Sequence, residues 1–201
     1  MKFGAFINRQ IGKGRMRLVG VALSVLLPTM PVEAESAWYY TAFGGVLTEG
    51  AWHDAINPNT FDLADAGLLG VGIGWQRRIG STFLSLGVEA QAVRHFGRQD
   101  HFEFNLPIIA RYAPEPASPS WITSTAFGLG LSYATKVPQV EIDRSGASQR
   151  KFFYWLAEVE FALPDPEANA FLRLHHRSDG FGYFDTDSGS TAIVFGWRKR
   201  F

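Results

Sequence analysis

The residues with the clearest catalytic potential lie near the C-terminus, in the segment Leu172-Arg-Leu-His-His-Arg-Ser-Asp-Gly180. If this segment is a β-strand, alternate side chains share a face, and His176 and Ser178 lie on the same side as the two leucines. Two residues apart on one face, an imidazole can reach a hydroxyl, and these groups form the base and nucleophile pair of acyl transfer. The opposite face would carry Arg173, His175 and Arg177.

A non-catalytic interpretation of the same segment is also available. The strand could simply end here, with His176 and Ser178 as ordinary residues at the rim of a membrane and the run His175-His176-Arg177 in contact with lipid phosphates. A polar pair on a lipid-facing wall is nevertheless costly, which favours a functional reason for its presence. The choice depends on the elements that position the segment.

Those elements are predicted to be β-strands, because period-2 alternation of apolar and polar residues recurs along the chain. In the second segment, for example, Leu69, Val71, Ile73 and Trp75 alternate with three glycines and a glutamine. Eight such segments are separated by turn residues: Trp38–Leu47, Leu69–Gln76, Leu84–Ala92, His101–Arg111, Ser124–Tyr133, Phe153–Phe161, Asn169–Ser178 and Thr191–Phe201.

The chemistry of the two faces indicates a membrane protein. One face is rich in Leu, Ile, Phe and Trp, whereas the other carries Gly, Ser, Glu, Gln and Arg, as expected for a lipid-facing wall around a polar lumen. We therefore predict an all-β fold, an eight-stranded antiparallel transmembrane β-barrel, with a soluble sandwich or lipocalin-like barrel as the alternative. Charges inside the lumen are expected to pair, with Glu158 or Glu160 bonded to Arg173 or Arg177. An eight-stranded barrel is wide enough for side chains but not for a broad aqueous channel.

The connections and the C-terminus agree with this fold. Short connections follow the second, fourth and sixth segments, and mostly longer, more polar ones follow the other four, at 48–67, 95–100, 136–149 and 179–189. Outer-membrane barrels have short periplasmic turns and longer outer loops. The chain also ends in Trp197-Arg-Lys-Arg-Phe201, and a terminal Phe on an amphipathic strand resembles the assembly signal of outer-membrane proteins.

The N-terminal part predicts export. Five basic residues precede the apolar run Leu18–Leu27, which is too short to span a bilayer as a helix, and Val32-Glu-Ala34 fits a cleavage site. We predict a signal peptide at 1–34 and the barrel at 35–201, with a short membrane anchor as the alternative. The true start is left open between Met1 and Met16.

The composition of the predicted mature chain excludes some partners. Removing residues 1–34 removes five basic residues and one acidic residue, which leaves 14 Lys and Arg against 18 Asp and Glu and a net charge of −4. A nucleic-acid partner would require a basic patch, so none is expected. The chain has no Cys, and a closed barrel is a device that can stabilise an exported protein without disulfides.

An eight-stranded barrel with His176-Arg-Ser178 near the end of its seventh strand resembles the lipid A 3-O-deacylase family of the outer membrane. The resemblance implies that Ser178 is the nucleophile, that His176 is its base, and that a downstream acidic residue orients the histidine. The family's acid is a Glu about a dozen residues after the serine, where this chain has Ser190, so Asp187 is the preferred candidate because it has the parity of the lipid face.

The resemblance also concerns the oxyanion hole. The family usually has Asn after the serine, and this chain has Asp179, whose carboxylate would oppose a developing oxyanion. Backbone N–H groups of Asp179 or Gly180 are therefore the expected donors. No metal and no soluble cofactor are implied.

Two functions follow from the sequence. The first is a serine esterase in the bacterial outer membrane, whose partner is the lipid A of lipopolysaccharide in the outer leaflet and whose product is a released 3-O fatty acyl chain. The alternative is a non-enzymatic barrel that acts as an adhesin or structural protein through its loops. Whether the barrel acts alone or as a homodimer is left open.

Overall fold

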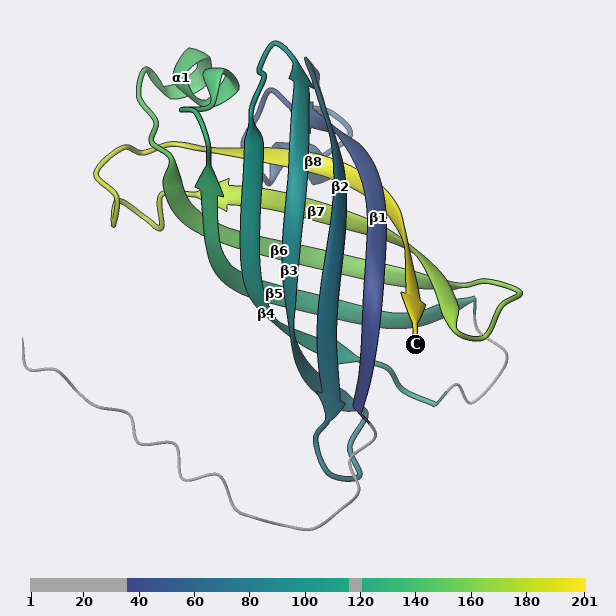
Figure 1. Ribbon diagram of the computed structural model, residues 1–201. Coiled ribbons are helices and arrows are strands. Elements are labelled where there is room, and N and C mark those ends of the chain that lie inside the picture. Colours follow the sequence, from purple (N-terminus) through teal and green to yellow (C-terminus); the bar gives the residue numbers. More distant parts are fainter. Residues whose placement is uncertain (1–35, 116–120) are drawn as a thin grey trace, which may run out of the picture. The chain divides into compact units, whose positions relative to one another are not determined.

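The computed structural model describes residues 36–115 and 121–201 of the chain. Eight antiparallel strands pair in sequence order, and β1 closes on β8, so that the described residues form a closed barrel (Figure 1). This confirms the predicted fold class. The strands are β1 Ser36–Thr48, β2 Leu63–Arg78, β3 Leu84–Gly97, β4 Phe102–Tyr112, β5 Ile122–Ala134, β6 Lys151–Ala162, β7 Ala168–Ser178 and β8 Gly189–Arg200.

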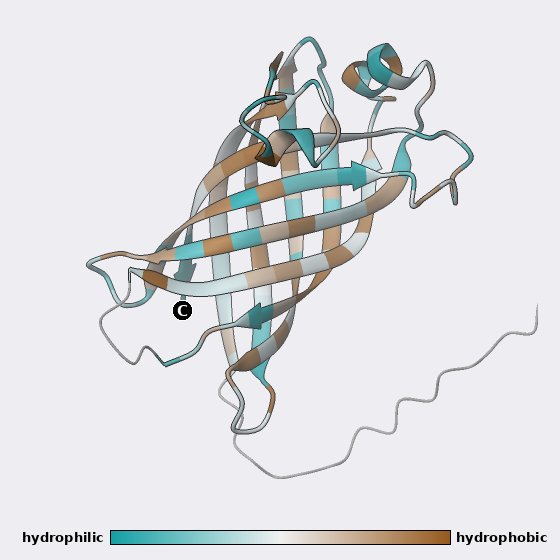
Figure 2. Ribbon diagram, turned by 180° about the vertical axis from the view of Figure 1, so that it is seen from behind, coloured by the Kyte–Doolittle hydropathy of each residue, from teal (hydrophilic) through white to brown (hydrophobic). Residues whose placement is uncertain are grey.

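The alternation in sequence becomes the division between wall and lumen. In β4, Phe104, Leu106 and Ile108 lie on the outside, with Ile108 65% exposed, whereas Glu103 and Asn105 are buried in the lumen. Figure 2 shows the resulting bands of apolar and polar residues along the strands. An apolar wall of this extent is typical of a surface that contacts hydrocarbon and not water.

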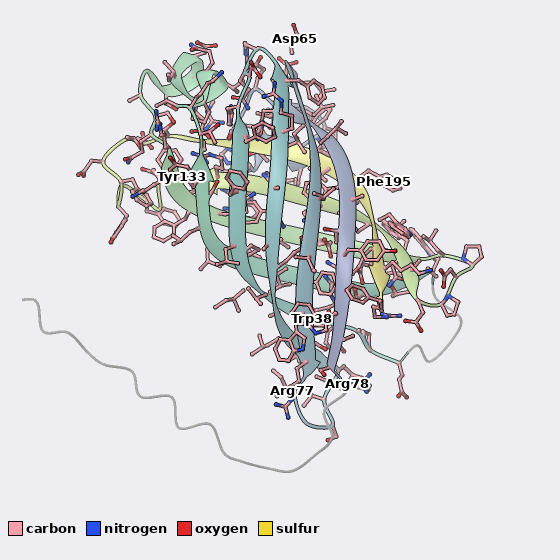
Figure 3. The ribbon with its side chains drawn as sticks, in the orientation of Figure 1. Trp38, Asp65, Arg77, Arg78, Tyr133 and Phe195 are labelled. Atoms are coloured by element: carbon pink, nitrogen blue, oxygen red, sulfur yellow. The ribbon has the colours of Figure 1, made fainter. Side chains whose placement is uncertain are left out.

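The two ends of the barrel differ from the wall. Figure 3 shows Tyr133 and Phe195 on the wall, Asp65 at one end, and Trp38, Arg77 and Arg78 at the opposite end. Charged side chains at both ends and aromatic side chains near them are the arrangement expected at membrane interfaces.

Inside the barrel, buried charges pair across the lumen. Glu158 lies 2.6 Å from Arg173 and 2.6 Å from Arg111, and it also contacts Arg198 at 3.1 Å. The predicted Glu158–Arg173 pair is therefore confirmed. The predicted pairing of Arg177 with Glu158 or Glu160 is wrong. Arg177 lies near the end of the barrel that carries the β5–β6 connection, here called the mouth, and it binds Glu141 of that connection.

The β5–β6 connection contains the helix α1, Gln139–Ser145. The helix ends at Gly146, whose φ of 76° is the left-handed conformation of a helix C-cap. Glu141 projects from α1 into the mouth, where its carboxylate accepts hydrogen bonds from Arg177 at 2.8 Å and from Ser190 at 2.7 Å. The helix therefore lies at the mouth of the barrel, to one side (Figure 1).

The other connections follow the predicted alternation of length, except the one between β3 and β4. The β1–β2 connection includes a short 3-10 helix, Asp54–Ile56, and the β7–β8 connection spans 179–188. The β3–β4 connection has only the four residues 98–101, because β3 continues to Gly97. At the opposite end the connections are 79–83, 113–121 and 163–167, of which 116–120 lie outside the described residues.

The predicted signal peptide, 1–34, also lies outside the described residues. Within the ranges that the structure describes, no helix is long and apolar enough to cross a membrane.

Candidate active site

Strand β7 presents His176 and Ser178 on the outer wall. Leu172 on the same face is exposed, whereas Arg173, His175 and Arg177 are buried in the lumen. In the register of the sheet, His176 lies opposite Trp155 of β6, and Ser178 lies opposite Phe153. The structure thus brings the two predicted catalytic residues to the end of one strand, on the side that faces lipid.

The imidazole of His176 is held in place on both sides. Its Nδ1 forms a 2.8 Å hydrogen bond with the hydroxyl of Thr191, its register partner on β8, and its ring packs on Trp155 with a centroid distance of 4.7 Å. Trp52 from the β1–β2 connection packs edge-on against Trp155. These contacts leave His176 only 7% exposed, and within the described ranges its Nε2 forms no hydrogen bond.

If Nδ1 carries the proton and donates it to Thr191, Nε2 has the free lone pair required of a general base. The hydroxyl of Thr191 can accept from or donate to Nδ1, so it orients the ring, and the tautomer with the proton on Nδ1 is the one that suits proton abstraction from Ser178. Sequence reasoning missed Thr191, although the neighbouring Ser190 was recognised as the position of the family's acid. The missing information is the register between β7 and β8, which places Thr191 and not Ser190 beside His176.

Ser178 lies at the last position of β7, where its Oγ accepts a 3.1 Å hydrogen bond from the N–H of Gly180. Among the described residues no hydrogen bond joins Ser178 to His176. Catalytic hydrogen bonds are often long or poorly aligned without substrate, so this geometry does not rule the pair out.

Gly180 is placed so that only glycine fits. Its φ is +72°, and a Cβ at this position would lie 2.3 Å from Cδ2 of Phe153. The left-handed backbone at Gly180 places its N–H beside the proposed nucleophile, where it donates to the serine oxygen.

The two aspartates predicted for the site, Asp179 and Asp187, both lie in the β7–β8 connection. The N–H of Asp179 donates to the carbonyl of Ser188 at 3.0 Å, and its carboxylate accepts from the N–H of Gly182 at 2.9 Å, so this residue organises the β7–β8 connection. Asp187 is exposed in the same connection with a φ of +44°, and no hydrogen bond or salt bridge within the described ranges joins it to His176. The structure therefore joins Ser178 to Gly180, bonds His176 to Thr191, and places neither carboxylate in contact with the imidazole.

An apolar groove lies next to Ser178 on the wall. Its volume is about 730 Å³, within the range of small-molecule sites. Phe153, the register partner of Ser178, is part of the lining, and its ring packs on Tyr183 and Phe184 of the β7–β8 connection at 5.4 and 5.3 Å. The groove continues across β5 and β4 along Tyr133, Leu131, Phe104 and Leu106.

The closed antiparallel barrel, its polar lumen and its apolar wall define an eight-stranded barrel of the bacterial outer-membrane class. Two solved structures show the same fold. The structure of Neisserial surface protein A (NspA) aligns with 83% of this chain and 99% of its own, with a TM-score of 0.50 and 15% identity. The outer-membrane enzyme PagL aligns with 80% of this chain and 98% of its own, with a TM-score of 0.52 and 11% identity. No protein-family model and no curated protein matches the chain in sequence.

Proposed function

We propose that this barrel is an outer-membrane serine esterase that removes the ester-linked fatty acyl chain at the 3-position of lipid A. The observation that carries the proposal is the position of Ser178 and His176, a nucleophile and a base on the lipid-facing wall, with Nδ1 of the histidine held by Thr191. That wall contacts the membrane leaflet in which lipid A lies. The fold is also that of a known enzyme, PagL.

The proposed reaction follows the two-step course of serine esterases. The Oγ of Ser178 attacks the ester carbonyl carbon, and its proton passes to Nε2 of His176. The sugar oxygen leaves with that proton, and the acyl group stays on Ser178. Water then attacks the acyl-enzyme while His176 takes its proton, which releases the free fatty acid and restores the hydroxyl of Ser178. The N–H of Gly180 is the proposed donor to the oxyanion.

The groove beside Phe153 supports the same substrate. Most of its lining is aromatic and aliphatic, with a few polar residues among them, so it suits the acyl chain of a lipid. The hydroxyl of Ser178, which lies opposite Phe153 in the register of the sheet, would meet the ester that joins this chain to the sugar.

Mass spectrometry of lipid A tests the proposal. Cells that express the wild type should lose one ester-linked acyl chain from lipid A, whereas cells that express Ser178→Ala or His176→Ala should retain it. Ser81→Ala, in the exposed connection at the other end of the barrel, is the matched control and should behave as wild type. Unchanged lipid A in all four strains, with the barrels folded, would contradict the enzyme and favour a non-enzymatic barrel that acts through its loops.

A further inference from the structure

Three histidines and a glutamate gather inside the barrel, just below the mouth. His95 lies on β3, His101 in the β3–β4 connection, Glu103 on β4 and His175 on β7. None of the four is more than 3% exposed. The cluster lies on the lumen side of the wall, so it is separate from His176 and Ser178, and the proposed esterase does not use it.

The donor atoms of the cluster are close together. Nε2 of His95 and Nε2 of His175 each lie 2.9 Å from Glu103, on separate carboxylate oxygens. The ring of His101 stacks on that of His95 with a centroid distance of 4.4 Å. One nitrogen from His95, one from His101 and one oxygen from Glu103 all lie within 4.8 Å of one another.

His101 provides the observation that hydrogen bonding within the protein does not explain. Its side chain is 2% exposed, yet its buried Nε2 has no hydrogen-bond partner. Buried polar atoms are almost always satisfied, so an atom without a partner beside two other metal-ligating groups points to a missing ligand. Nδ1 of His95 accepts a 2.8 Å hydrogen bond from the amide nitrogen of Gln99, and metal binding through Nε2 requires this amide to turn so that its oxygen accepts from Nδ1 instead.

We propose that His95, His101 and Glu103 bind a divalent cation of the zinc type. Two imidazole nitrogens and one carboxylate oxygen suit Zn²⁺, whereas Ca²⁺ and Mg²⁺ prefer oxygen ligands. Binding requires His95 to give up the proton that it shares with Glu103, while His175 keeps its hydrogen bond to the other carboxylate oxygen and orients it. The nearby Arg177 is paired with Glu141, which offsets its charge.

The burial of the cluster indicates a structural role. A cation here would link β3, the β3–β4 connection and β4 through three protein ligands, with β7 attached through His175. A chain without cysteines would thus acquire a cross-link at the mouth of its barrel, behind the strand that carries His176.

Metal titration of the folded, metal-free barrel in detergent tests the site. Co²⁺ should bind with one ion per chain and produce the visible absorption bands of nitrogen and oxygen coordination, and Zn²⁺ should displace it, whereas Ca²⁺ and Mg²⁺ should not. His101→Ala should weaken Co²⁺ binding by at least the roughly 10–100-fold that loss of a ligand's supporting partner costs in known sites. His53→Ala, which removes an exposed histidine from the β1–β2 connection, should leave binding unchanged.

Folding of each variant is checked by its mobility on an unheated detergent gel. If His101→Ala does not fold, His101→Phe replaces it, because the phenyl ring keeps the stack with His95. Zn²⁺ should also raise the melting temperature of the wild type but not of the His101 variant. Absence of Co²⁺ bands in the wild type, or equal affinity in the wild type and the His101 variant, would overturn the site and leave a hydrogen-bonded cluster.

Discussion

At the scale of single residues, the candidate site has a neutral group where serine esterases commonly have a carboxylate. The hydroxyl of Thr191 can orient His176, but it has no charge with which to stabilise the imidazolium that forms during attack. The site is therefore better described as a serine and histidine pair with a positioning threonine than as an acid-containing triad.

Replacement of Thr191 by valine tests this role. Thr191→Val keeps the shape of the side chain and removes one neutral hydrogen bond, which contributes about 0.5–1.5 kcal/mol, so kcat should fall up to about tenfold while KM changes little. Kinetics of fatty acid release from lipid A in detergent would measure both constants. Thr48→Val is the control, because Thr48 bonds the backbone carbonyl of Thr191 and not the imidazole. Equal kcat for Thr191→Val and the control would contradict the role of Thr191.

The extent to which this site could be predicted differs from residue to residue. Strand parity was enough to place His176 and Ser178 on the wall, because alternation is a local property of one strand. The same parity argument selected Asp187, but this residue lies in a connection with a left-handed backbone, where alternation no longer determines direction. Thr191 could not be identified, since its contact with His176 depends on the register between two strands.

At the scale of elements, α1 is the part of the structure that the sequence did not predict. It has only seven residues, too few for a helical periodicity to be recognised, and its stability comes from tertiary contacts. The central contact is the buried Glu141, which binds Arg177 and Ser190 in the mouth. A second contact is made by Arg144, which donates to the carbonyl of Gly50 at 2.8 Å and thereby joins α1 to the β1–β2 connection.

Removal of the Glu141 carboxylate should release α1 from the mouth. Glu141→Ala leaves Arg177 buried without its partner, a change that typically costs about 3–5 kcal/mol, and undocking of the helix should relieve this cost. Hydrogen exchange should then increase in 135–150 and stay slow in the strands. Glu141→Gln, which keeps the side-chain size and part of the hydrogen bonding, should have a smaller effect. Unchanged protection of α1 in Glu141→Ala would contradict the proposed anchoring.

At the scale of the whole molecule, the barrel was predictable because its signal repeats. Each strand shows weak alternation, yet eight segments with the same alternation and with polar connections between them specify a closed sheet with a polar interior. The pairing inside the lumen was predictable only in part. Glu158 and Arg173 meet as expected, but Glu158 also binds Arg111 and Arg198, and no local pattern indicates how three arginines converge on one carboxylate.

This network should close the lumen to ions. The fully buried Arg173 also contacts Glu89 at 3.2 Å, so charged side chains bridge several strands across the interior. In planar bilayers the wild-type barrel should therefore show no stable conductance above the background of the membrane. A refolded porin of known conductance is the positive control. Steady single-channel openings of the wild type would show that the interior is not sealed as described.

The central claim, that Ser178 is a nucleophile activated by His176 on the lipid-facing wall, is tested most directly by covalent capture. A long-chain alkyl fluorophosphonate in detergent should react with the serine: Oγ bonds to phosphorus, fluoride leaves and the proton passes to Nε2 of His176. Peptide mass spectrometry should find the phosphonate on Ser178 in the wild type, and a much slower reaction in His176→Ala. An unlabelled Ser178, or equal labelling with and without His176, would contradict the account.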